Sequence, residues 1–281
     1  MLTGAENKGP ELGDSLAPLF FCLAMLDDCD RVIIESRRGS CEKPSAPVAI
    51  IVCTETDRRR FCRLALRVAE SAREFYNARF LDLFYADRTI TLAGPVLGAP
   101  QAVLVLERLI ALGSRAVVVL GWCGSLQPQI RIGDWVMPTG TRSEEGTSAH
   151  YPTVSPAVAP DPLLASRLQS FCDQGDPPLH AGPVWSTDAP LRETVGKVLS
   201  YGGEGVLAVE MEMAALLRVA EYRRVRLAGL LVVSDELFTL KWRPGFRSAT
   251  FKSSCRRAVR ALLDCCAALP PELGSSSPAG C

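Results

Sequence analysis

The sequence predicts an α/β fold in which a mostly parallel sheet carries helices on both faces. Three uninterrupted apolar runs, PVAIIVC at 47–53, RAVVVL at 115–120 and RLAGLLVV at 226–233, have the composition of strands buried on both sides. Amphipathic segments of helical length lie between these runs, and such alternation is typical of α/β domains. The 281 residues suffice for one domain of this class or for two small ones.

Hydrophobic periodicity and segment length assign the elements in chain order. The expected strands cover residues 47–53, 86–92, 115–120, 134–138, 182–185, 206–209 and 226–233. The expected helices cover residues 58–76, 100–112, 162–171, 210–222 and 249–269. In α/β sheets, ligands bind beyond the carboxyl ends of the strands, so the residues that follow each strand are candidates for a functional site.

The two ends of the chain differ in composition from the segment between them. Apolar residues recur at helical spacing between residues 16 and 26 and predict a helix, which a polar linker follows. The last residues are rich in Pro, Gly and Ser and predict a flexible tail. We therefore expect an N-terminal extension over 1–45, a domain over 46–269 and a tail over 270–281.

Composition excludes several classes of protein. The 31 Lys and Arg balance the 31 Asp and Glu, so no net charge favours nucleic acid or acidic membranes as partners. No apolar run approaches the roughly 18 to 20 residues that cross a bilayer, and the first residues lack the pattern of a secretory signal. The 11 cysteines contain no Cys-x-x-Cys pair, and only two histidines accompany them. We expect a cytoplasmic protein in a reducing compartment, without a metal site.

Glu210, Met211 and Glu212 lie between an expected strand and an expected helix. The helix dipole favours acidic residues in a first helical turn, which is a sufficient explanation for them. A carboxylate at this place can instead accept hydrogen bonds from both hydroxyls of a ribose, because it has two acceptor oxygens. The motif alone leaves both interpretations open.

Ser234 and Asp235 follow the most apolar run of the sequence. Either residue can cap the following turn, which contributes about 1 kcal/mol. A carboxyl group at the mouth of the sheet is also partly removed from water. Its pKa is then raised, and it can donate a proton to a leaving group.

Two further segments follow expected strands. Gly121, Trp122, Cys123, Gly124 and Ser125 come after RAVVVL, where two glycines allow a ligand to approach the backbone or form a plain turn. Arg58 begins an expected helix just after the strand at 47–53. Its guanidinium either faces water or reaches a bound phosphate or carboxylate.

The order of these motifs resembles that of a known protein family. Residues 94–138 combine a Gly-rich strand end, a helix ending in Leu-Gly, a strand, a Gly-x-x-Gly segment and a Gly-Asp pair. There follow RSEEGTSAHY at 142–151, STDA at 186–189, VEMEMAAL at 209–216 and VVSDEL at 232–237. This succession resembles the purine and uridine phosphorylase family, which includes the methylthioadenosine and adenosylhomocysteine nucleosidases. The resemblance covers about residues 47–269.

The resemblance implies a three-layer α/β sandwich that forms homodimers or homohexamers and cleaves the N-glycosidic bond of a nucleoside. By motif match, Met211 packs beneath the ribose, Glu212 binds its hydroxyls and Glu210 lies beside them. Asp235 matches the acid that donates to N7 of a purine, so a purine-type base is implied. Base-binding residues expected from the same motifs are Trp185, Ser186, Ser234 and Asp235.

The implied chemistry needs no metal or organic cofactor, and inorganic phosphate is the possible co-substrate. As the glycosidic bond stretches, the sugar becomes oxocarbenium-like and the base gains negative charge. A proton donor at the base and oriented contacts at the ribose therefore act where charge develops.

The sequence departs from the family pattern at the acceptor site. Phosphorolytic members carry an arginine and a Ser or Thr at the places held here by Val119 and Trp122. Arg58 keeps an anion contact beside the Gly121 segment. In the hydrolytic branch a carboxylate of the same loop activates water, and Glu55 or Asp57 takes that place. The aromatic residue that follows Ser-x-Asp-x in the family is replaced by a proline, so Trp185, Trp122 or Phe238 is expected to stack on the base.

Three functions therefore stay open. Phosphorolysis of a purine-type nucleoside is the family default, and hydrolysis by water is the alternative that the missing phosphate ligands favour. The third is a non-catalytic protein that binds a nucleoside, although the presence of both Glu212 and Asp235 argues for catalysis.

Overall fold

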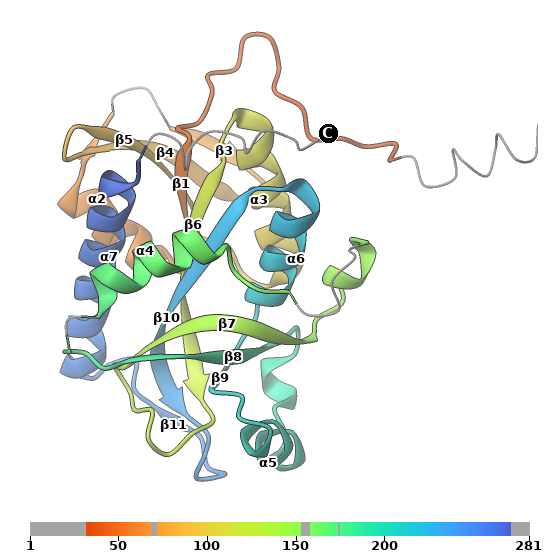
Figure 1. The fold of residues 1–281 in the computed structure, drawn as a ribbon, viewed down its shortest axis with the longest axis vertical. Coiled ribbons are helices and arrows are strands. Elements are labelled where there is room, and N and C mark those ends of the chain that lie inside the picture. Colours follow the sequence, from red (N-terminus) through yellow and green to blue (C-terminus); the bar gives the residue numbers. More distant parts are fainter. Residues whose placement is uncertain (1–31, 69–71, 153–157, 174, 271–281) are drawn as a thin grey trace, which may run out of the picture. The chain divides into compact units, whose positions relative to one another are not determined.

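The computed structural model describes residues 32–68, 72–152, 158–173 and 175–270 (Figure 1). The chain divides into two units, Met1–Ser36 and Arg37–Cys281, and the second carries the fold given below. The helix expected near residues 16–26 and the tail after residue 270 lie outside the described residues. No helix in the described ranges is long and apolar enough to cross a membrane.

One mixed sheet of eleven strands forms the centre of the second unit, within the described residues. The strands are β1 Val48–Val52, β2 Leu66–Arg67, β3 Arg73–Phe75, β4 Ala78–Tyr85, β5 Arg88–Gly94, β6 Ala116–Ser125, β7 Trp135–Glu144, β8 Leu179–Thr187, β9 Ala208–Glu210, β10 Arg226–Glu236 and β11 Arg243–Pro244. Their order is β11-β10-β7-β8-β9-β6-β1-β5-β4-β2, and β3 pairs with β4. Because β10 also pairs with β6, strands β6, β10, β7, β8 and β9 close into a ring.

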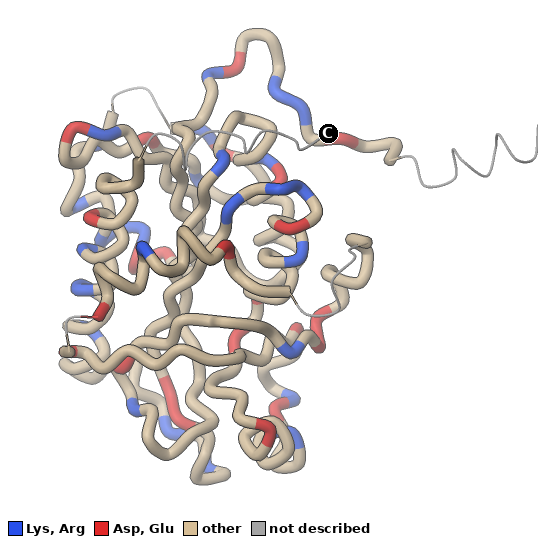
Figure 2. Tube along the Cα trace, in the orientation of Figure 1, with Lys and Arg blue, Asp and Glu red and all other residues tan. Residues whose placement is uncertain are grey.

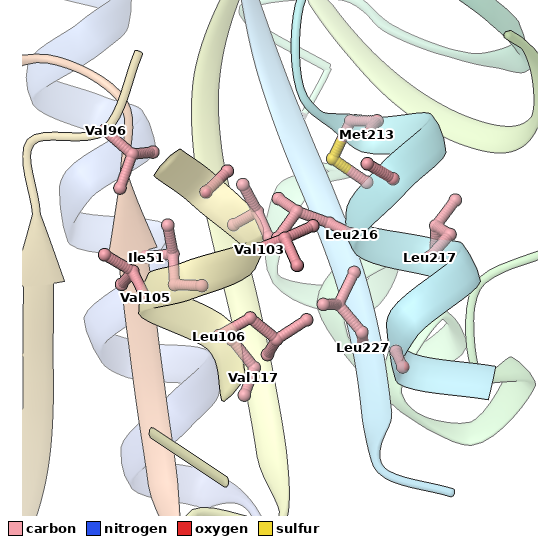
Figure 3. Close-up of a cluster of buried hydrophobic side chains, with 14 of the residues drawn as sticks. Ile51, Val96, Val103, Val105, Leu106, Val117, Met213, Leu216, Leu217 and Leu227 are labelled. Carbon is pink, nitrogen blue, oxygen red and sulfur yellow. The ribbon is translucent and has the colours of Figure 1, made fainter. Parts of the chain in front are cut away.

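Helices cover both faces of the sheet. They are α2 Glu55–Leu64, α3 Ala99–Leu112, α4 Pro162–Cys172, α5 Val195–Gly203, α6 Met213–Arg223 and α7 Ala249–Ala268, with 3₁₀ turns at Ser148–His150 and Pro190–Arg192. One apolar cluster places α3 and α6 over one face of β1, β6 and β10, and Figure 3 shows Leu106 and Leu216 within it. A second cluster holds α2, α4 and α7 on the opposite face. The predicted α/β architecture with helices on both faces is confirmed.

The two longest helices have clear start and stop residues. Helix α3 begins after Gly98 with Pro100 in its first turn and ends at Gly113, which adopts the left-handed conformation with φ 114°. Helix α7 begins at the cap Ser248, whose hydroxyl accepts a hydrogen bond from the amide of Phe251. The expected helices over 100–112 and 249–269 agree with these bounds to within one residue.

The region between Arg58 and Leu92 differs from the sequence-based prediction. The expected helix over 58–76 ends at Leu64, and short strands β2 and β3 occupy part of the remainder. The expected strand over 86–92 is β5, and its unexpected antiparallel neighbour β4 precedes it. Residues 76–77 and 86–87 have positive φ and form tight hairpin turns. The prediction failed because cross-strand pairing, which sequence periodicity does not show, decides these segments.

Several strands extend beyond their predicted ends. Strand β6 continues through the expected Gly121–Ser125 turn, because it pairs with β10 and β9 over those residues. Strand β10 includes Ser234 and Asp235, and its register against β6 shifts by one residue between Val233 and Asp235. The helix expected to start at residue 210 starts at Met213 instead, since Glu210 ends β9. Strands β7 and β8 are likewise longer than expected.

Candidate active site

Three motifs that are distant in sequence meet where β6, β9 and β10 end. Gly124 of β6 pairs with Val209 on one side and with Asp235 on the other. Ser186 at the end of β8 pairs with Glu210. A cavity of about 460 Å³ opens here, which we call the strand-end cavity. Its lining consists of Trp122, Cys123, Gly124, Pro190, Leu191, Glu193, Val209, Glu210, Met211, Ser234, Asp235, Leu237, Trp242 and Phe246.

Asp235 is held in place by two donors. Its Oδ1 accepts a hydrogen bond from the Ser234 hydroxyl at 2.6 Å, and its Oδ2 accepts one from the indole nitrogen of Trp242 at 3.0 Å. Burial raises the pKa of the Asp235 carboxyl, and these two hydrogen bonds oppose part of that rise. A carboxyl group with a raised pKa that lines a cavity is suited to donate a proton.

Glu193 is a second carboxyl in the cavity lining, and the sequence did not indicate it. Burial raises its pKa to about 7, and the nearby negative charge of Asp235 contributes to that rise. The residue follows the 3₁₀ turn Pro190–Arg192, outside every recognised motif. No signal in the sequence could have found it, since only the fold brings this loop beside β10.

Glu210 and Glu212 are both buried beneath the cavity. Oε2 of Glu210 accepts the amides of Glu212 and Met213, each at 2.7 Å, and its other oxygen accepts the Ser186 hydroxyl. Oε1 of Glu212 accepts the amide of Gly98 at 2.7 Å. Burial raises the pKa of both carboxyls, and the charge of Glu212 raises that of Glu210 further.

The structure gives the Glu210–Glu212 motif a capping role and also places part of it beside the expected ligand. Glu210 caps the amides at the start of α6, as an acidic residue at a helix N-terminus does. Yet Glu210 and Met211 also line the strand-end cavity, whereas Glu212 is not part of its lining. The structure thus brings Glu210 and Met211 to the place where a ribose is expected, with Glu212 directly beside them.

The expected acceptor residues Glu55, Asp57 and Arg58 are all engaged with neighbouring side chains. The indole nitrogen of Trp122 donates to Oδ2 of the buried Asp57 at 2.6 Å, and Arg60 forms an ion pair with the same carboxylate. The guanidinium of Arg58 donates to both oxygens of Glu55, at 2.6 and 2.8 Å, and holds the pKa of Glu55 at about 2. Of these residues, only Trp122 lines the cavity.

Gly121 is explained by packing. A Cβ at this position would lie 3.0 Å from Cδ2 of Leu231 and 3.3 Å from Sγ of Cys53. The residue belongs to the continuous strand β6, so its amide does not lie in an open turn. The expectation of a Gly-x-x-Gly turn at this site is therefore wrong.

Trp185 and Ser186 are buried and do not line the cavity. Trp185 is entirely buried, and its ring packs edge-on against Tyr201 with 4.9 Å between ring centroids. The Ser186 hydroxyl is used by Glu210. The structure therefore does not bring Trp185 to the cavity surface. The aromatic residues that reach it are Trp122, Trp242 and Phe246, and Phe238 instead lies beside Arg131.

The chemistry of the cavity is acidic and aromatic. Its lining contains the carboxyls of Glu193, Glu210 and Asp235 but no Lys or Arg, among the described residues. Within the same ranges, no group of three or more His, Cys, Asp or Glu side chains is placed to hold a metal ion. The arrangement can stack a flat base, protonate it and contact a sugar.

Comparison with known sequences and structures identifies the family of the chain and the class of its fold. The sequence matches the phosphorylase superfamily over residues 47–269, and the chain belongs to that superfamily.

Named relatives and solved structures agree with this assignment. The guanosine phosphorylase of Halorubrum lacusprofundi is 30% identical over 159 residues, which are 57% of this chain and 66% of that protein. The purine nucleoside phosphorylase of Myxococcus xanthus is 29% identical over 196 residues, 68% of this chain and 82% of that protein.

The same fold occurs in the purine nucleoside phosphorylase of Toxoplasma gondii in complex with immucillin-H. Its TM-score is 0.71 at 19% identity, over 79% of this chain and 91% of that one. The uridine phosphorylase of Vibrio fischeri gives a TM-score of 0.72 at 21% identity, over 83% of this chain and 98% of that one.

Proposed function

We propose that this protein cleaves the N-glycosidic bond of a purine nucleoside, with inorganic phosphate as the acceptor of the sugar. The observation that carries the proposal is the position of Asp235, which lines the strand-end cavity together with Glu210 and Met211 and whose pKa is raised by burial. The relatives named guanosine and purine nucleoside phosphorylase support the reaction and the purine base.

The proposed mechanism uses the charge that develops as the bond breaks. Asp235 donates its proton to N7 of the departing purine, while Ser234 and Trp242 hold the carboxyl in place. Met211 and Glu210 contact the ribose as it gains oxocarbenium character. Such contacts accelerate the reaction because they strengthen as charge develops.

Trp122, Trp242 and Phe246 provide the proposed stacking surface for the base. The ring centroids of Trp122 and Phe246 lie 5.9 Å apart, and those of Trp242 and Phe246 lie 6.3 Å apart. A flat purine gains contact area against such rings without needing specific polar contacts. These three rings take the stacking role expected for Trp185, which is fully buried.

Hydrolysis is a second candidate, because a specific observation favours it. Where phosphate is expected to bind, the cavity is lined by Trp122, whose indole donates to Asp57. The expected phosphate ligand Arg58 instead donates to Glu55. A doubly charged nucleophile gains from several convergent donors, whereas water needs only a base and a place to bind. Glu193 is the carboxyl of the lining whose pKa of about 7 suits that role.

One incubation separates the candidates. The purified protein is mixed with guanosine, inosine and adenosine, with and without phosphate, and the products are followed by chromatography. Phosphate-dependent release of base with ribose 1-phosphate supports phosphorolysis. Release of base and free ribose without phosphate supports hydrolysis. Absence of any release, with nucleoside binding retained, contradicts both and leaves a binding protein.

The remaining expectations belong to the same proposal. The reaction as written needs no metal or organic cofactor. A homodimer or homohexamer and a cytoplasmic location are proposed from the family resemblance. Sedimentation of the purified protein tests the assembly directly.

A further inference from the structure

A second cavity, of about 600 Å³, lies between α2, α4, α7 and the start of β7. Five arginines line it, Arg60 and Arg63 from α2 and Arg256, Arg257 and Arg260 from α7, and we call it the arginine cavity. Its lining contains two carboxylates, Asp176 and Asp264. Figure 2 shows blue segments along α2 and α7 on this side of the molecule, with red segments among them.

The cations of this cavity are only partly neutralised. Arg60 pairs with Asp57, Arg257 pairs with Asp176 at 2.7 Å, and the Arg260 guanidinium donates to the Tyr85 hydroxyl at 3.3 Å. Within the described residues, the guanidinium groups of Arg63 and Arg256 have no hydrogen-bond or ion-pair partner. Like charges gathered around one cavity repel each other, so a bound anion would stabilise the group.

The arginines frame an apolar floor. Leu64, Trp135, Phe171 and Ala261 supply it, with Leu64 at the end of α2 and Phe171 near the end of α4. Guanidinium groups match phosphate oxygens in two-point geometry, while an apolar wall receives a flat ring. A cavity of this size also exceeds what a single inorganic ion fills.

We propose that the arginine cavity binds a phosphorylated aromatic metabolite of the nucleoside diphosphate class. Phosphate groups contact Arg63 and Arg256, and the ring lies on the apolar floor. Among the described residues, the arginine cavity and the strand-end cavity have no lining residue in common. The proposal is therefore independent of the reaction that the strand-end cavity performs.

The test uses the full chain and GDP as the probe, with binding measured by calorimetry in phosphate-free buffer. We expect GDP to bind the wild type at one site and Arg256→Glu to weaken binding by about tenfold or more, since charged hydrogen bonds are lost. Arg63→Glu should act in the same direction. Arg38→Glu is the matched control, because it makes the same charge change at an exposed residue outside the cavity.

Four results would overturn the proposal. GDP fails to bind, or guanosine displaces it and so places it in the strand-end cavity. Arg38→Glu weakens binding as much as Arg256→Glu, which indicates general attraction to positive charge. Inorganic pyrophosphate binds as tightly as GDP, which removes the role of the apolar floor. Circular dichroism of each variant confirms that the fold is retained.

A bonded chain joins the two cavities. Arg60 lines the arginine cavity and pairs with Asp57, which accepts the indole of Trp122 in the strand-end cavity. An anion beside Arg60 competes with Asp57 for that guanidinium. We expect GDP to change the tryptophan fluorescence of the wild type, and Trp122→Phe to bind GDP with a smaller change. Equal changes in both proteins would contradict this coupling.

Discussion

The strand-end cavity and the arginine cavity carry opposite charges on one chain whose net formal charge is zero. Three carboxyls line the first, and five arginines line the second. In the first, burial raises the pKa of Asp235 and Glu193, so these groups are held ready to exchange protons. Guanidinium groups in the second keep their charge at all ordinary pH values. The strand-end cavity is therefore suited to proton transfer, whereas the arginine cavity is suited to binding anions at any ordinary pH.

The largest effect is expected at Asp235. Asp235→Asn removes the proton donor but keeps the shape of the side chain, whose amide oxygen can still accept the hydrogen bond from Trp242. We expect kcat for a purine nucleoside to fall about 100- to 10,000-fold, the usual contribution of a general acid. Steady-state kinetics measures the loss, and thermal melting checks that the fold is intact. Wild-type turnover in this variant would remove Asp235 from the mechanism.

The next effect concerns the link between the cavities. Trp122→Phe deletes the indole donor and leaves the buried Asp57 short of one partner. We expect a loss of about 1–3 kcal/mol in the free energy of unfolding, measured by urea titration. Trp242→Phe is the control, because its ring is 66% exposed and its loss should cost below about 0.5 kcal/mol. Equal losses would mean that Asp57 does not depend on Trp122.

The next prediction concerns the pH dependence of stability that Glu193 causes. Its pKa of about 7 in the fold lies above the ordinary value of a glutamate carboxyl, so the folded state binds the proton more tightly than the unfolded chain. The stabilisation that this provides is present below the unfolded pKa and is lost as pH rises through the folded one. Glu193→Gln should therefore melt at a higher temperature than the wild type above pH 7.

The advantage of Glu193→Gln should shrink steadily as pH falls below 7 and vanish only well below the unfolded pKa, where the wild-type carboxyl is protonated in both states. Differential scanning calorimetry across this range measures it. A pH-independent difference between the two proteins would show that the carboxyl does not titrate as described.

The smallest effect is expected in the arginine cavity. The double substitution Arg63→Glu and Arg256→Glu changes two exposed residues that contact no part of the strand-end cavity. Turnover of a purine nucleoside without GDP should stay within about twofold, and stability within about 0.5 kcal/mol. A large loss of turnover would show that the two cavities do not act independently.

Sequence reasoning worked where a signal was local. Helix α3 was placed by its periodicity and by Gly113 at its end, and Asp235 by its position after an apolar strand. It failed where partners distant in sequence decide the structure. Strands β2, β3 and β4 form through antiparallel pairing, and Gly121 lies in a strand because β10 and β9 pair beside β6.

The same reasoning explains the residues of the site. Glu210 and Met211 belong to a motif with recognisable order, so the sequence could name them. Trp242 and Phe246 are exposed or half-buried aromatic residues in a loop, and nothing in their spacing marks them as a base platform. Trp185 is one of the three aromatic residues expected to stack in place of the residue that Pro190 replaces, yet it is buried in the apolar cluster with Tyr201.

The register shift in β10 makes strand length itself a determinant of the site. In a regular strand, neighbouring side chains point to opposite faces, so a hydroxyl and the next carboxyl do not meet. Here Ser234 is the extra residue of the bulge, and its hydroxyl reaches Asp235 at 2.6 Å. A relative one residue shorter at this point would keep the aspartate and lose its fixed orientation. Insertions and deletions within β10 can therefore alter this site as deeply as substitutions.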